Sequence, residues 1–443
     1  MLKFFKSLYL NQRFYYAIFT IALLFLFSYF IEFLYGFTWV LSLILLLLFG
    51  SDLISLYRKN QVSAERILPQ KLSNSDENEV EIMVENKYRF SINVEIIDEI
   101  PIQFQKRDFL KKIKIEAATT ERFSYYLRPV TRGEYFYGKL NIYVFTNIGL
   151  VKKRLVFGNQ QMLKVYPSFI QMKQLDFLAI DNRLSQPGLK KIRRIGHTME
   201  FEQIKEYVPG DDVRTINWKA SAKQGELMVN QFQDERAQPI YSIIDTGRVM
   251  KMPFNGLSLL DYAINSSLAF SNIALKKKDK VGLISFSAKI ESILKANAKL
   301  SQLQQIMERL YNINTKFPDS DFSMLYSNLR KSVSQRSLMM LYTNFEHISA
   351  LKRQLPYLKA INKKHVLVVI FFENTELDKI IASCPDNTTD MAHQVIAEGF
   401  AHQKKLMAAE LRKHSINTLL TRPEELSINT INKYLEIKAR GIL

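Results

Sequence analysis

The sequence contains a single cysteine, Cys384, among 443 residues, and only 15 glycines and 12 prolines. One cysteine excludes an intramolecular disulfide, so the chain is not a disulfide-stabilised scaffold, and it agrees with a reducing compartment. The few glycines and prolines, together with 30 Phe and 21 Tyr, exclude a chain that is mostly disordered. At roughly 150 residues per domain, the length predicts about three domains.

Several catalytic signatures are also absent. The sequence has no glycine-rich dinucleotide loop, no P-loop and no Gly-x-Ser-x-Gly elbow. None of the six histidines has the spacing of metal ligands: His197, His347, His365, His393, His402 and His414. We therefore predict that the protein is not an enzyme and that it binds no cofactor.

The formal net charge is +18, from 61 Lys and Arg against 43 Asp and Glu. The densest basic run consists of Arg183, Lys190, Lys191, Arg193 and Arg194. Nucleic-acid-binding proteins usually interleave such charge with aromatic residues or place it on a recognition helix, and neither pattern is visible. We predict no nucleic-acid partner. A solvated loop is the simplest interpretation of this run, and contact with anionic membrane lipid is the functional one.

Two apolar runs lie at the N-terminus. Residues 14–31 carry no charged side chain, and neither do residues 33–51, with only Glu32 between them. Because a membrane-spanning helix needs about 20 apolar residues, the stretch predicts a two-helix transmembrane hairpin within residues 1–59 that turns at residues 32–36. A cleaved signal peptide is the competing interpretation, but the apolar stretch is too long and no small-residue cleavage site follows it.

Basic side chains flank both ends of this stretch: Lys3, Lys6 and Arg13 precede it, and Arg58 and Lys59 follow it. Positively charged flanks remain on the cytoplasmic side of a membrane. We therefore predict a multi-pass protein with both termini, and everything after about residue 60, in the cytoplasm.

Two folded domains are predicted after the apolar stretch. Short runs of alternating apolar and polar residues, such as 80–84, 91–96 and 141–145, predict an antiparallel β-sandwich over residues 60–170. Beyond residue 239, continuous apolar strands alternate with amphipathic helices, which predicts a doubly wound, mostly parallel α/β sheet over residues 239–443. The strands are expected at 240–244, 281–286, 338–342, 365–371 and 417–420, and the helices at 257–277, 299–311, 322–334, 348–362 and 389–413.

A distinctive motif lies in the connector between these domains, residues 171–238. Residues 207–222 read Tyr-x-Pro-Gly-Asp-Asp-x-Arg-x-Ile-Asn-Trp-Lys-Ala-Ser-Ala, and residues 227–232 read Leu-x-Val-x-Gln-Phe. This motif closely resembles the signature of the bacterial "domain of unknown function 58" family. That family is described as a membrane hairpin, a β-rich domain, this signature and a C-terminal domain similar to von Willebrand factor A.

The resemblance implies a location in the bacterial inner membrane and a von Willebrand A-like fold for residues 239–443. It also implies protein partners, namely MoxR-class AAA+ ATPases and other von Willebrand A proteins. It implies no established activity.

Within the motif, four residues are candidates for binding: Asp212, Arg214, Trp218 and Lys219. Arg214 can form a bidentate ion pair with Asp212 or Glu206, and Trp218 offers a large anchor. Asp211 or Asp212 is expected to cap a short helix over residues 214–221. The functional interpretation is a docking surface; the structural one is that the same residues fasten the two domains together.

The family fold implies a further test, because von Willebrand A domains usually hold a divalent cation. The ligands are Asp-x-Ser-x-Ser after the first strand, a Thr from a second loop and an Asp after a later strand. Here residues 245–249 read Asp-Thr-Gly-Arg-Val, so both serine oxygens are missing, and Asn344 takes the place of the later Asp. We predict no metal, with Asp245 the one clearly retained ligand, either paired with a Lys or Arg or capping a helix. Residues 318–323 could still offer oxygens.

Three functions remain open. The first is a membrane-anchored cytoplasmic scaffold or adaptor that engages protein partners, and the second is an envelope assembly subunit that acts through its membrane hairpin. The third is a divalent-metal-dependent ligand-binding domain or enzyme.

Overall fold

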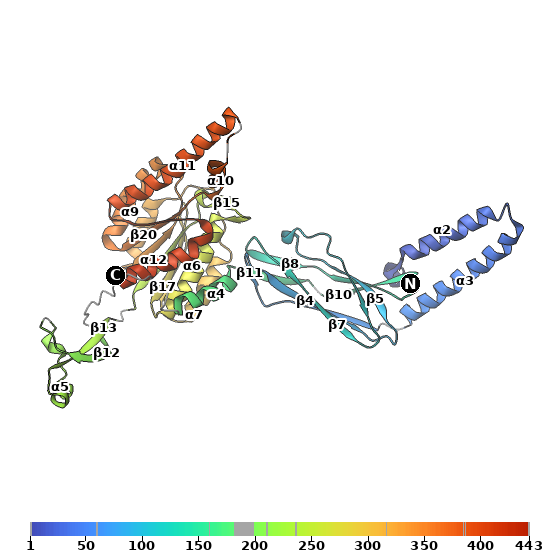
Figure 1. The fold of residues 1–443 in the computed structure, drawn as a ribbon, viewed down its shortest axis with the longest axis horizontal. Helices are drawn as coiled ribbons and strands as arrows, with labels where there is room; N and C mark the ends of the chain where they lie inside the picture. The colour runs from blue at the N-terminus through green and yellow to red at the C-terminus, as the bar shows by residue number, and fades with distance from the viewer. Residues whose placement is uncertain are drawn as a thin grey trace. The chain divides into compact units, whose positions relative to one another are not determined.

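The structure is a computed structural model that describes residues 2–58, 61–158, 160–180, 199–209, 211–234, 237–315, 317–383, 385 and 387–441. The basic run at 183–194, His197 and Cys384 lie outside the described residues. By its internal contacts the chain divides into two units, Met1–Val165 and Tyr166–Leu443, which are described separately below (Figure 1).

Two apolar helices, α2 (Gln12–Phe27) and α3 (Glu32–Tyr57), follow the short α1 (Leu2–Ser7) in the first unit. They lie side by side: the ring centroids of Phe14 and Phe49 are 5.1 Å apart, and those of Phe25 and Trp39 are 5.9 Å apart (Figure 1). Within the described part of the chain, α3 alone is long and apolar enough to cross a membrane, since α2 has 16 residues. The first unit thus has one candidate membrane span near the N-terminus.

The turn between α2 and α3 lies at residues 28–31 and not at the predicted residues 32–36. α2 ends at Phe27, four residues before the predicted end of the first span, and Ser28 donates hydrogen bonds to the carbonyls of its last turn. The predicted turn at 32–36 is wrong, because Glu32 already begins α3. A carboxylate is favourable there, where the helix dipole is positive, and no proline interrupts the following residues.

The rest of the first unit consists of antiparallel strands, as the alternating pattern predicted. One sheet has the order β1-β10-β9-β5-β6, and two three-stranded sheets have the orders β2-β4-β7 and β3-β11-β8. Side chains of β4, β5 and β9 share one core, which contains the fully buried Ile82, Ile92 and Ile142. The strands are β1 (Leu8–Leu10), β2 (Val62–Ile67), β3 (Leu72–Ser73), β4 (Asn78–Asn86), β5 (Ile92–Asp98), β6 (Lys111–Ile115), β7 (Thr120–Leu127), β8 (Gly133–Tyr137), β9 (Leu140–Phe145), β10 (Val151–Phe157) and β11 (Gln161–Tyr166).

The second unit contains a six-stranded sheet of order β18-β17-β14-β19-β20-β21. All pairs are parallel except β17 with β18, which is antiparallel. The five predicted strands are present; the edge strand β18 was not predicted. The strands are β14 (Pro239–Asp245), β17 (Lys280–Phe286), β18 (Ile290–Asn297), β19 (Leu338–Tyr342), β20 (Val366–Phe372) and β21 (Asn417–Thr421).

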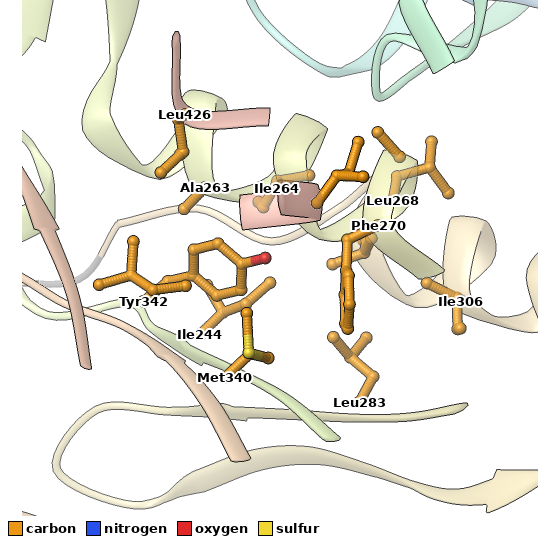
Figure 2. Packing of buried hydrophobic residues seen from close by; sticks show 14 of the residues in the cluster. Ile244, Ala263, Ile264, Leu268, Phe270, Leu283, Ile306, Met340, Tyr342 and Leu426 are labelled. Carbon is orange, nitrogen blue, oxygen red and sulfur yellow. The ribbon is translucent and has the colours of Figure 1, made fainter. Parts of the chain in front are cut away.

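Helices cover both faces of this sheet, so all seven residues of β14 are buried. On one face α6 (Leu259–Lys276), α7 (Ser301–Leu310) and α12 (Leu426–Ala439) share a core with the strands. Figure 2 shows Ile244, Met340 and Tyr342 of the strands beside Ala263 and Phe270 of α6. On the other face lie α8 (Phe322–Ser332), α9 (Ile348–Lys364) and α11 (Thr388–Lys413).

A further helix, α4 (Phe169–Ile180), lies in the stretch that the sequence assigned to the end of the sandwich and the connector. Met172 of α4 is buried in the core that contains α6, and Phe169 and Leu175 pack against it. These residues therefore belong to the α/β unit, which begins earlier in the chain than residue 239.

Candidate functional site

The carboxyl ends of β14 and β19 lie next to each other at the centre of the sheet. The chain leaves β14 toward α6 on one face and leaves β19 toward α9 on the other. Ligands of open α/β sheets bind at such a switch in direction. Asp245, the last residue of β14, and Thr343 and Asn344, which follow β19, occupy this position.

Asp245 is fully buried and accepts three hydrogen bonds. Its Oδ1 accepts from the hydroxyl of Ser320 and from the backbone N–H of Gly247 at 2.8 Å, and its Oδ2 accepts from Thr343 Oγ1 at 2.6 Å. Burial raises the pKa of this carboxyl, and the hydrogen bonds from Ser320 and Thr343 oppose that shift.

The prediction that Asp245 pairs with a cationic side chain or caps a helix is wrong. Two hydroxyls and one amide are its partners, while the nearby Arg248 approaches Asp319 at 3.6 Å. Ser320 comes from the loop at 318–323 that was expected to offer oxygens. Its hydroxyl donates to the carboxyl group of Asp245.

Gly247 makes room for this arrangement. A Cβ at position 247 would lie 3.0 Å from Asp245 Oδ1, 3.3 Å from Pro318 O and closer still to the hydroxyl of Ser320. A serine at position 247, as in the usual metal motif, would therefore collide with the hydroxyl of Ser320. Ser320 can approach Asp245 only because residue 247 has no side chain.

Gly247→Ala is expected to lower the free energy of unfolding by about 2 kcal/mol, since overpacking typically costs 1–3 kcal/mol. Thermal unfolding of the full chain measures this loss. Gly399→Ala is the matched control, because a Cβ at position 399 meets nothing within 4 Å and alanine favours a helix. Equal melting temperatures for the two variants would contradict the proposed crowding at Gly247.

Asn344, which stands where a metal-binding Asp was expected, is bonded to a lysine. Its Oδ1 accepts from Lys404 Nζ of α11 at 2.6 Å, and the same ammonium donates to Phe345 O at 2.5 Å. Burial lowers the pKa of Lys404 to about 8. A cavity of about 600 Å³ lies beside Lys404.

These residues do not fit a divalent cation. The oxygens of Asp245 are engaged by hydroxyls, Gly247 offers no side-chain ligand, and Asn344 faces an ammonium group. In the described ranges no three His, Cys, Asp or Glu side chains cluster as metal ligands do. A hard cation prefers several free oxygens in octahedral arrangement.

The signature motif forms a β-hairpin with a structured insertion. β12 (Met199–Glu206) pairs with β13 (Met228–Asp234), and between them lie the 3₁₀ turn η3 (Val213–Thr215) and α5 (Trp218–Gln224). Asn217 caps α5 by accepting from Ala220 N at 3.0 Å, and its Nδ2 donates to Asn230 Oδ1 at 2.8 Å. Ser221 Oγ accepts from Met228 N at 2.8 Å, which ties α5 to β13.

The contacts predicted within the motif are partly wrong. Asp212 Oδ1 accepts from the backbone N of Arg214 at 3.0 Å, so it caps η3 instead of pairing with the guanidinium. Asp211 forms the ion pair, with Lys205 at 2.8 Å. The expected helix over 214–221 is divided at Asn217. Trp218 is 70% exposed, and Lys219 is also exposed.

The signature motif lies within the part of the chain that matches a known family. A family model described as "Protein of unknown function DUF58" matches residues 203–384. The DUF58 resemblance is confirmed for this part of the chain. The "Uncharacterized protein YeaD" of Bacillus subtilis is 26% identical over 124 residues, which cover 28% of this chain and 30% of that protein.

Two solved structures are similar to parts of the chain. The conserved hypothetical protein BatB from Bacteroides thetaiotaomicron is 14% identical, with a TM-score of 0.31, and covers 45% of this chain and 99% of its own. A PapD-like domain of human CEP192 is 12% identical, with a TM-score of 0.19, and covers 24% of this chain and 87% of its own.

The sequence predictions included Ser320 only as part of the loop at residues 318–323, and they did not include Thr343 or Lys404. Thr343 lies between a buried strand and Asn344, which was predicted to follow that strand, so the place of Thr343 at the switch point could have been inferred. Lys404 carries no such signal, because it lies 60 positions from Asn344, to which it donates a hydrogen bond.

Proposed function

We propose that this protein is a membrane-anchored cytoplasmic scaffold or adaptor that binds protein partners through its signature motif. The observation that carries the proposal is the exposure of Trp218, at 70%, on a short helix held by side-chain hydrogen bonds. Tryptophan is enriched among the residues that dominate protein interfaces. The exposed Val208, Val213 and Leu227 of the same motif add apolar surface.

The proposed anchor is a transmembrane hairpin formed by α2 and α3 in the bacterial inner membrane. It is supported by the length and apolar composition of α3 and by the exposure of Phe33, Leu46 and Leu47 on its surface. Arg13 lies in the first turn of α2 and Arg58 is the C-cap of α3, so both lie at the same end of the pair. By the positive-inside rule, that end and both chain termini are cytoplasmic.

The proposed partners are a MoxR-class AAA+ ATPase and other von Willebrand A proteins. The DUF58 match and a doubly wound sheet, to which we assign a von Willebrand A-like fold, support this choice. The chain acts as a binding protein and not as an enzyme in this proposal. The hydroxyl partners of Asp245 argue against metal-dependent ligand binding.

Trp218→Ala is expected to weaken binding of the ATPase at least tenfold, since truncation of a central interface tryptophan commonly costs about 2 kcal/mol. The full chain is reconstituted in nanodiscs and titrated with the purified MoxR-class ATPase of the same organism. Because Trp218 is exposed, the melting temperature should not change.

Lys223→Ala is the matched control, since Lys223 is exposed on the same helix. Equal affinities for the two variants would contradict the docking surface. The alternative function is an envelope assembly subunit that acts through the exposed apolar surfaces of α2 and α3. It would be favoured if other membrane subunits bound the wild type and Trp218→Ala equally well.

A further inference from the structure

We infer that the cavity at the carboxyl ends of β19 and β20 binds an acidic side chain of a partner peptide, with Lys404 as its counter-charge. The inference rests on the proposed function, because it names the chemistry of a second contact with a protein partner. It concerns a surface separate from the signature motif.

The cavity has a volume of about 600 Å³ and is lined mostly by apolar surface. Its apolar lining comes from separate segments of the second unit, including the β15–β16 hairpin (Pro253–Phe254 and Leu257–Ser258) and α10 (Thr375–Ala382). The larger of these side chains include Phe254, Leu259, Phe372, Leu377, Phe400 and Leu420. A site of this kind takes an apolar group together with one polar group that fixes its orientation.

Lys404 is the polar group that lacks a partner of opposite charge. In the described part of the chain its two hydrogen bonds go to uncharged oxygens, those of Asn344 and Phe345. An ammonium has three N–H donors, so one remains for a ligand. Glu346 is exposed and acts on Lys404 only through space.

A carboxylate in the cavity would compensate the charge of Lys404. Burial of an ammonium without a counter-charge is unfavourable, as the lowered pKa of Lys404 reflects. Three acids line the cavity: Asp378 is paired with Arg422 at 3.2 Å, and in the described part of the chain neither Glu346 nor Glu373 forms a hydrogen bond or ion pair with Lys404. A carboxylate of the ligand can therefore supply the missing negative charge.

The surface that leads out of the cavity favours a peptide over a small carboxylic acid. Ile396, Phe400 and Lys404 are spaced four residues apart on α11 and so lie on one face of the helix. Ile396 is 55% exposed and Phe400 is 42% exposed. A peptide with an apolar residue near its acid covers this face, whereas a small molecule in the cavity leaves Ile396 exposed.

The test uses the full chain in nanodiscs and an array of ten-residue peptides that each place a Glu beside Leu or Phe. Each peptide has a twin with Gln in place of Glu. We expect some Glu peptides to bind saturably and their Gln twins to bind at least tenfold more weakly. Lys404→Met and Lys404→Gln should remove this preference, while Lys405→Met, at an exposed lining residue, should keep it.

Binding that ignores the Glu-to-Gln change, or that survives in both Lys404 variants at wild-type melting temperature, would overturn the inference. The Gln variant keeps a hydrogen-bond donor, so the charge is tested apart from folding. ATPase binding that persists while the peptides show no preference would overturn only the carboxylate site. Peptide preference without ATPase binding would uphold the site and contradict the proposed ATPase partner.

Discussion

Asp52→Ala is expected to lower the free energy of unfolding of the first unit by about 3 kcal/mol. Asp52 lies near the end of α3 and is 1% exposed. It accepts from Thr146 Oγ1 at 2.6 Å and from the backbone N–H groups of Leu150 and Val151 at 2.9 Å each. Loss of the acceptor leaves buried donors without partners, which costs roughly 1–3 kcal/mol for each.

The measurement is thermal unfolding in detergent together with hydrogen exchange at the amides of Leu150 and Val151. Both amides should exchange faster in Asp52→Ala. Ser55→Ala is the control, because Ser55 is exposed on the same helix. Unchanged exchange at both amides would show that the carboxylate does not hold this turn.

The effect should be large because both helices hold the same β9–β10 turn. From the start of α2, Asn11 Nδ2 donates to Gly149 O at 2.8 Å, and Arg13 Nη1 donates to Asn147 O at 2.9 Å. At the end of α3, the carbonyl of Leu56 accepts from Lys153 Nζ at 2.7 Å. The apolar helices therefore contact the strands through polar groups, and the contacts of Asp52 and Lys153 are buried.

Asp245→Ala is expected to have a similar effect on the second unit, a loss of about 3 kcal/mol. It leaves the hydroxyls of Ser320 and Thr343 and the N–H of Gly247 without their acceptor, at roughly 1–3 kcal/mol for each buried group. Chemical denaturation of the full chain measures the loss. A change below about 0.5 kcal/mol, the range of surface substitutions, would contradict the central position of this carboxylate.

The same residue predicts a pH dependence. Burial raises the pKa of Asp245 in the folded protein above its unfolded value of about 3.9. The folded state therefore binds the proton more tightly than the unfolded state does. The resulting stabilisation is complete below the unfolded pKa and is lost as the pH rises through the folded pKa. Asp245→Asn does not ionise, so its stability relative to wild type should improve as pH rises from 4 to 8. Denaturation across this range tests the sign, and a relative decline of the Asn variant would contradict it.

The strands of the α/β sheet could be predicted because both faces are buried, which produces the continuous apolar runs in β14, β19 and β20. β18 was missed because its side chains are only half-buried or exposed along an edge. The turn between α2 and α3 was misplaced because both sides of it are apolar, and composition alone does not locate a helix end there.

The individual residues of the candidate site were predictable mainly where they follow a strand. Asp245 was identified from its place after β14, but its partners Ser320 and Thr343 lie 75 and 98 positions away. Lys404 was overlooked because α11 reads as a polar helix, and the sequence does not tell which of its lysines turns toward the sheet. Tertiary packing alone brings that ammonium to Asn344.

The most direct test of the proposed scaffold function is photo-crosslinking in living cells, with a photoreactive phenylalanine analogue in place of Trp218. The crosslinked proteins are identified by mass spectrometry, and the same probe at Lys223 is the control. The proposal predicts a crosslink from position 218 to a cytoplasmic AAA+ ATPase that is absent or weak from position 223. Crosslinks from position 218 only to other parts of the same chain, or only to membrane subunits, would contradict it.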